Sequence, residues 1–127
     1  MVNFVYTLDT NTIIYYLKSE EETCKIVERI YAEGEAIYVS TITEAELFAF
    51  SRLDKQESDK IDTFLRTVSI ILLDSRIARL SGSLQKEYGL KLADSAIAAT
   101  ALFTGSTLVT RNIRDFKKIP ELKLREA

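Results

Sequence analysis

The chain has 127 residues, a length that suits one domain, and its 46% hydrophobic and 28% charged residues are typical of a folded globular protein. It contains no histidine and a single cysteine, Cys24, which excludes Ser-His-Asp triads, disulfides, imidazole metal sites and cysteine-rich zinc sites. An enzyme of this composition would work with carboxylates, hydroxyls, amides, lysine and arginine, and carboxylates favour hard cations such as Mg²⁺ or Mn²⁺. The net charge is −2, so contact with nucleic acid would need a local basic patch.

Short apolar runs alternate with helical segments along the chain. Strands are predicted at residues 2–8, 36–39, 69–73, 107–110 and 122–124. Helices are predicted at residues 10–17, 21–33, 41–52, 55–67, 76–88 and 92–103, with Cys24 on the apolar stripe of the second. This alternation predicts an α/β fold in one domain, residues 1–127, with a parallel sheet between helices. No apolar run is long enough to span a bilayer, so we expect a cytoplasmic protein with no membrane contact.

Ligands bind to such sheets at the carboxyl ends of the strands, where this chain carries acidic residues. Asp9 follows the first strand, with Asn11 close by, and is either a helix N-cap or a member of a site. Asp74 follows the third strand, and we interpret it as the N-cap of the next helix.

Glu46 lies in the helix that follows the second strand, inside an apolar stripe. The stripe consists of Ile42, Ala45, Ala49 and Phe50. Because an unpaired carboxylate is costly to bury, Glu46 is expected to face either a structural ion-pair partner or a metal ion. Glu44 lies about 200° further round the helix and is expected to face solvent.

Asp94 lies in the first turn of the most apolar helix, residues 92–103, which we expect in the core or at a dimer interface. The helix dipole favours an anion there, so Asp94 either stabilises the helix or belongs to a site. Asn112 and Asp115 follow the fourth strand and are either turn residues or site members. The basic residues around them form either a solvated surface or a rim that contacts phosphates; they are Arg111, Arg114, Lys117 and Lys118.

A doubly wound sheet can bring acidic residues from separate segments to one edge. The candidates are Asp9, Glu46, Asp94 and Asp115. Clustered carboxylates repel one another unless cations neutralise them, and one or two Mg²⁺ or Mn²⁺ ions would do so. The chemistry that this arrangement favours is phosphodiester hydrolysis, because a metal ion activates water without a histidine base.

Four stretches of the chain resemble the PIN-domain ribonucleases of the VapC toxin type. They are residues 8–11 (LDTN), 40–47 (STITEAEL), 92–101 (LADSAIAATA) and 108–116 (LVTRNIRDF). The resemblance implies a three-layer α/β/α fold with sheet order 3-2-1-4-5 and Mg²⁺- or Mn²⁺-dependent endonucleolytic cleavage of RNA. It also implies a homodimer and a VapB-type antitoxin that covers the active site, with DNA bound only through the antitoxin.

The resemblance carries catalytic and metal-binding roles to particular residues of this chain. These are Asp9, Glu46, Asp94 and Asp115, with supporting polar roles for Asn11, Thr110 and Asn112. Asn112 stands where many PIN domains have an acid, so the last metal position falls either to Asn112 or to Asp115.

Three other functions compete with this one. A phospho-receiver domain needs adjacent acids after the first strand, but Thr10 follows Asp9. A haloacid-dehalogenase-type phosphatase needs a second acid where Asn11 stands. A PIN domain that binds RNA or protein without cutting is the remaining alternative, and metal-dependent turnover separates it from a nuclease.

Overall fold

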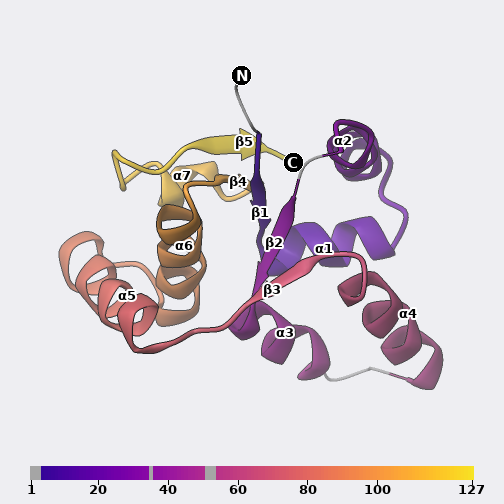
Figure 1. Ribbon diagram of the computed structural model, residues 1–127, viewed down its shortest axis with the longest axis horizontal. Helices are drawn as coiled ribbons and strands as arrows, with labels where there is room; N and C mark the ends of the chain where they lie inside the picture. Colours follow the sequence, from indigo (N-terminus) through magenta and orange to yellow (C-terminus); the bar gives the residue numbers. More distant parts are fainter. Residues whose placement is uncertain (1–3, 35, 51–53) are drawn as a thin grey trace.

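A parallel five-stranded sheet forms the centre of the molecule (Figure 1). The computed structural model describes residues 4–34, 36–50 and 54–127. The strands are β1 (Tyr6–Leu8), β2 (Ile37–Ser40), β3 (Ser69–Ile71), β4 (Thr107–Thr110) and β5 (Leu124–Glu126). Their order, β3-β2-β1-β4-β5, confirms the order implied by the resemblance.

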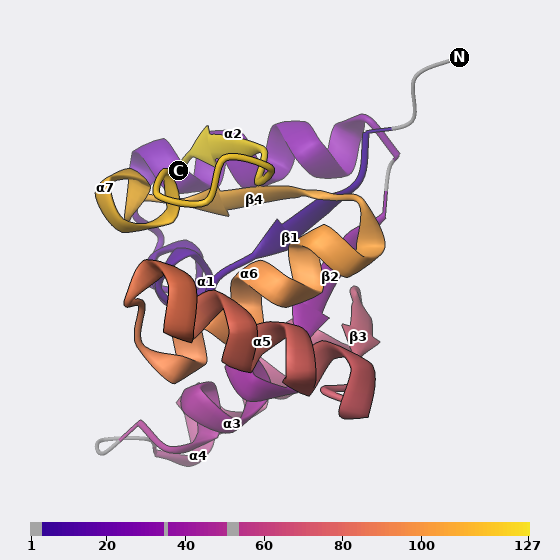
Figure 2. The same cartoon turned by 90° about the vertical axis from the view of Figure 1, so that its left-hand side faces the viewer.

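Helices cover both faces of this sheet, as Figures 1 and 2 show. They are α1 (Thr10–Leu17), α2 (Glu21–Ala32), α3 (Thr41–Phe48), α4 (Lys55–Leu65), α5 (Ser75–Tyr88), α6 (Leu92–Thr104) and α7 (Ile113–Phe116). Side chains of α1, α2, α3 and α4 share one buried cluster with β1 and β2. Side chains of α5, α6 and α7 form a second cluster with β4. The fold therefore has the predicted three layers.

Helix α6 is the most deeply buried helix that the structure describes. Every residue from Ser95 to Ala101 is buried, and Ile97 is 1% exposed. Its ends reach the surface, where Leu92 and Phe103 are exposed. The prediction that this apolar segment lies in the core is confirmed, because a helix without a polar face has to be covered along its length.

Helix α3 differs most from its prediction. It ends at Phe48 rather than near residue 52, and residues 51–53 lie outside the described part of the chain. Its buried residues are Thr43 and Leu47. Within the expected stripe, Ile42 is partly buried, and Ala45, Ala49 and Phe50 are exposed. The stripe prediction was wrong because the helix ends at Phe48, which leaves Ala49 and Phe50 outside it, while Leu47, 1% exposed, packs into the first cluster.

Smaller differences fall at the ends of elements. The first strand begins at Tyr6 rather than at residue 2, and residues 1–3 are not described. Strand β5 occupies Leu124–Glu126 rather than residues 122–124, and Leu122 is buried in the second cluster. Cys24 is only half-buried on α2, with its Sγ 3.6 Å from the Tyr16 carbonyl oxygen. No helix in the described ranges combines the length and the apolarity that crossing a membrane requires.

Candidate active site

The carboxyl ends of β1, β2 and β4 meet at one edge of the sheet. The order of the strands reverses between β1 and β4, which is the switch point where α/β sheets bind ligands. Asp9 directly follows β1, and its backbone N–H lies 3.4 Å from the Val109 carbonyl oxygen of β4. Two segments far apart in sequence are thereby joined at the switch point.

Asp9 is both a helix cap and part of this edge. Its Oδ1 accepts a 2.9 Å hydrogen bond from the Thr12 backbone N–H, which makes it the N-cap of α1. Its Oδ2 accepts a 2.5 Å hydrogen bond from the Thr110 hydroxyl at the end of β4. Only 6% of the Asp9 surface is exposed, so the two bonds hold the carboxylate in one orientation.

Glu46 reaches the same edge from α3. Its Oε1 accepts a 2.6 Å hydrogen bond from the Thr10 hydroxyl, which also lies 3.1 Å from the Thr43 hydroxyl. Glu46 is exposed and Glu44 is half-buried, so the expected difference in burial is reversed. Sequence reasoning missed Thr10 as the contact that orients Glu46, because the bond joins residues 36 positions apart.

The charges of the other three candidate acids act on Asp94. Burial raises its pKa first, and the negative charges of Glu46, Asp9 and Asp115 raise it further. Lys91, just before α6, opposes the shift. The structure thus places the other three sequence-predicted acids near enough to Asp94 for their charges to act on it.

Asn112 and Asp115 act together at the start of α7. The Asn112 Nδ2 donates to Asp115 Oδ2 at 3.1 Å, and the Asn112 backbone N–H donates to the Thr110 hydroxyl oxygen at 2.9 Å. Lys118 Nζ lies 3.8 Å from Asp115 Oδ1. The amide is therefore bonded directly to the acid that shares this turn with it.

The remaining predicted residues lie around this edge in different environments. Asn11 is exposed on α1. Arg114 and Lys117 are exposed on and after α7. Arg111 instead turns toward α2, where it pairs with Glu20.

The residue types at this edge fit a hard divalent cation. The donors are carboxylate and hydroxyl oxygens, which Mg²⁺ and Mn²⁺ prefer. Burial and the negative charges of Glu46, Asp9 and Asp115 all raise the pKa of Asp94, and a bound cation would offset those charges. In the described parts of the chain, no three acidic or cysteine side chains already surround a single point closely enough to hold an ion. Asp9 and Glu46 each direct a carboxylate oxygen toward a threonine hydroxyl.

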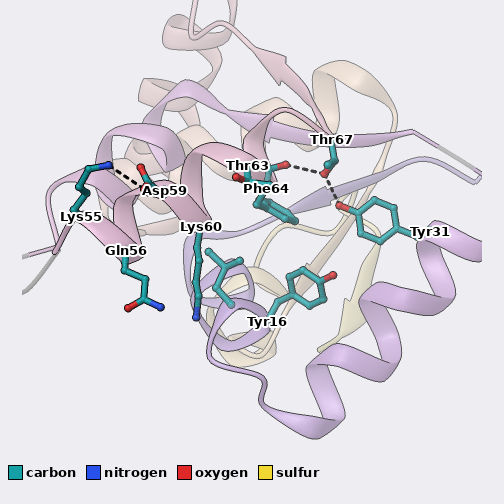
Figure 3. A pocket seen from close by; sticks show the side chains of 10 residues that line it. Tyr16, Tyr31, Lys55, Gln56, Asp59, Lys60, Thr63, Phe64 and Thr67 are labelled. Carbon is teal, nitrogen blue, oxygen red and sulfur yellow. Dashed lines mark hydrogen bonds and ion pairs between the residues drawn. The ribbon is translucent and has the colours of Figure 1, made fainter.

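A separate groove lies between α1, α2 and α4 (Figure 3). Its volume is about 830 Å³, and its walls include Tyr16, Tyr31 and Phe64 with Lys55 and Lys60 at its margin. A second hollow of about 320 Å³ shares Leu17 and Lys60 with the groove and extends to α3. None of the four candidate acids lines either space.

Comparison with known proteins identifies the class to which this fold and edge belong. The family model for the PIN domain matches residues 6–122. The chain belongs to the PIN-domain family.

Relatives of the chain within this family include VapC proteins. Ribonuclease VapC2 of Rickettsia felis is 34% identical over 128 residues, which cover 94% of this chain and 96% of that protein. The tRNA(fMet)-specific endonuclease VapC of Salmonella typhimurium is 27% identical over 129 residues, covering 95% and 96%. The crystal structure of VapBC2 from Rickettsia felis, bound to a DNA fragment from their promoter, superposes with a TM-score of 0.83 at 32% identity and covers 98% of this chain and 99% of that chain. The chain thus belongs to the VapC family of PIN-domain proteins.

Proposed function

We propose that this chain is the metal-dependent endoribonuclease toxin of a VapBC-type toxin–antitoxin module. The observation that carries the proposal is the convergence of Asp9, Glu46 and Asp115 on Asp94 at the carboxyl edge of the sheet. The similarity to VapC ribonucleases supports RNA as the substrate class. The reaction is hydrolysis of RNA phosphodiester bonds.

Asp9, Glu46, Asp94 and Asp115 would hold Mg²⁺ or Mn²⁺ at this edge. When bound, the ion lowers the pKa of water and stabilises charge on the phosphate oxygens. The raised pKa of Asp94 means that its carboxyl keeps a proton to higher pH than an ordinary aspartate. Binding of a cation requires that proton to leave, so metal affinity is expected to rise with pH.

Neighbouring polar residues hold these acids in place. Thr110 donates to Asp9, and Thr10 donates to Glu46. Asn112 donates to Asp115 Oδ2, and Lys118 Nζ lies 3.8 Å from Asp115 Oδ1. We assign supporting polar roles to Thr110, Asn112 and the exposed Asn11. These roles resemble the outer contacts that commonly orient metal ligands.

The basic residues after β4 provide the contact with RNA. Arg114, Lys117 and Lys118 lie on or just after α7, next to Asp115. Phosphate groups of the substrate would pair with these side chains, while the acidic edge takes the scissile phosphate. An acidic protein can bind RNA in this way because the positive charge is local.

The partner that we propose is a VapB-type antitoxin, because the solved neighbours include VapBC complexes. The groove between α1, α2 and α4 is the surface that we assign to one of its segments. Aromatic side chains line this groove, and such surfaces suit the apolar face of a peptide or helix. We further propose that the toxin is a homodimer and contacts DNA only through the antitoxin.

The test is cleavage of structured and single-stranded RNAs by purified, antitoxin-free protein with Mg²⁺, with Mn²⁺ and with EDTA. The Asp9→Asn variant is the control for contaminating nucleases. We expect cleavage that requires metal and disappears in the variant. Retained RNA binding without cleavage by the folded, metal-supplied protein would contradict the proposal and favour the non-cleaving alternative.

A further inference from the structure

Arg111 makes the most extensive set of contacts among the four basic residues after β4. Its guanidinium pairs with the Glu20 carboxylate, and its Nη2 also donates to the Thr23 hydroxyl at 3.0 Å. Its Nε donates to the Ala127 carbonyl oxygen at 3.2 Å, and its Cζ lies 4.2 Å from the centre of the Tyr15 ring. The side chain therefore joins α1, the start of α2 and the segment after β5.

Glu20, the partner of Arg111, is itself held in place by hydrogen bonds. It is the N-cap of α2, where its carboxylate accepts from the backbone N–H groups of Glu22 and Thr23 at 3.3 Å each. The Thr23 hydroxyl donates to the same carboxylate at 2.6 Å. The exposed fractions of the Arg111 and Glu20 side chains are 37% and 33%. A charge-assisted pair with this many additional contacts is better ordered than an isolated surface ion pair.

The backbone of Arg111 lies between two residues of the acidic edge. The preceding residue, Thr110, donates to Asp9, and the following residue, Asn112, donates to Asp115. A movement of the Arg111 backbone would therefore shift both contacts. The guanidinium contacts Tyr15 of α1 and Glu20, the N-cap of α2, whereas the end of β4 itself is bonded to α1 through the Thr12 hydroxyl and the Val109 carbonyl oxygen.

We propose that Arg111 is a positioning residue that holds the loop after β4 against α1 and α2, and that it does not contact the RNA phosphates. The inference rests on the proposed ribonuclease function and divides the basic residues into two groups. Arg111 points toward α1 and α2 and, through its own backbone, fixes the positions of Asn112 and Asp115. Arg114, Lys117 and Lys118 face the substrate.

The first experiment compares Arg111→Gln and Glu20→Gln in steady-state RNA cleavage. Both variants should lower kcat about tenfold with KM within about twofold, the pattern of displaced catalytic groups with intact substrate binding. The double variant should be no worse than either single variant, because both remove the same contact. Arg111→Lys should recover only part of the rate, since lysine lacks the planar fork and stacks less well on Tyr15.

The second experiment measures the salt dependence of RNA binding in EDTA, where cleavage is absent. Loss of one phosphate contact to single-stranded RNA reduces the slope of log K against log salt by about 0.7. Arg114→Gln should show that reduction, and Arg111→Gln should retain the wild-type slope. A reduced slope in Arg111→Gln together with wild-type kcat in Glu20→Gln would overturn the proposal.

The third experiment does not depend on RNA and separates this inference from the proposed function. Backbone hydrogen exchange at residues 110–116 should become faster in both Arg111→Gln and Glu20→Gln. Arg66→Gln is the matched control, because it removes an exposed 2.8 Å ion pair with Asp62 elsewhere on the surface. Unchanged exchange in both test variants would refute the positioning role, whether or not the wild-type protein cleaves RNA.

Discussion

Asp74 and Asp94 lie at the starts of two helices that follow each other in the chain, and the pKa values of their carboxyl groups are shifted in opposite directions. Asp74 caps α5 by accepting a 3.1 Å hydrogen bond from the Ile77 backbone N–H. This bond, with a further contribution from Arg76, lowers the pKa of Asp74. Burial and three nearby acids raise the pKa of Asp94 in the first turn of α6.

This difference in pKa distinguishes Asp74, whose charged form stabilises the fold, from Asp94, whose charged form destabilises it. The partners of Asp74 favour its charged form, as expected for a helix cap. The surroundings of Asp94 disfavour its charged form, even though a helix N-terminus favours an anion. Environments that oppose ionisation are common at functional sites, so the raised pKa of Asp94 agrees with the proposal that Asp94, rather than Asp74, belongs to the site.

The largest expected effect is on cleavage. Asp94→Asn should reduce the rate about a thousandfold, because loss of a metal ligand forfeits several kcal/mol of transition-state stabilisation. Asp74→Asn should stay within about twofold of wild type, since its side chain caps α5 outside the acidic edge. Single-turnover cleavage with Mg²⁺ measures both. Equal losses in the two variants would remove the distinction between the aspartates.

The stability of α6 gives the next largest effect. Ile97→Ala should lower the free energy of unfolding by about 3 kcal/mol, because it leaves a cavity around a side chain that is 1% exposed. Leu92→Ala, at the exposed start of the same helix, should change it by less than about 0.5 kcal/mol. Urea denaturation measures the free energy of unfolding of both variants. A large loss for Ile97→Ala alone would show that the buried part of α6, which carries Asp94, is tightly packed.

A smaller effect is expected for the hydroxyl that orients Glu46. Thr10→Val keeps the shape of the side chain but removes the 2.6 Å hydrogen bond, and cleavage should fall about tenfold. Ser83→Ala is the control, since it deletes a hydroxyl that bonds only to its own helix α5. Wild-type cleavage by Thr10→Val would show that Glu46 needs no orienting partner.

The smallest expected effect is a difference in pH dependence in protein freed of divalent ions. The raised pKa of Asp94 means that the folded state binds more protons than the unfolded state above pH 3.8. The stability contributed by neutral Asp94 is complete below that pH and is lost as pH rises through its folded pKa. Asp94→Asn should therefore become progressively more stable than wild type as pH rises.

Asp74 should show the opposite trend. Its lowered pKa contributes stability that is present above pH 3.8 and is lost as pH falls through the folded pKa. The difference between wild type and Asp74→Asn should therefore shrink in acid. Urea denaturation between about pH 3 and about pH 7 checks both signs. If the stability differences from wild type changed with pH in the same way for Asp94→Asn and Asp74→Asn, the opposite pKa shifts of the two aspartates would be contradicted.

Local patterns in the sequence were sufficient for much of the fold. The apolar segment of α6, the cap at Asp74 and the alternation of strands and helices all appear as predicted. Each depends on residues close together in the chain. The stripe predicted for α3 was wrong, because the helix ends before two of its four members and buries Thr43 and Leu47 instead. Its members were Ile42, Ala45, Ala49 and Phe50.

The sequence by itself determined which acids this protein carries to the edge of its sheet, because a strand's carboxyl end and a helix's first turn can be read locally. Only the tertiary structure decided how those acids are held. The bond from Thr10 to Glu46 and the pair between Arg111 and Glu20 join residues 36 and 91 positions apart. Such contacts depend on how α1, α2, α3 and the end of β4 pack together, and side-chain partners across that packing have no periodic signature in the chain.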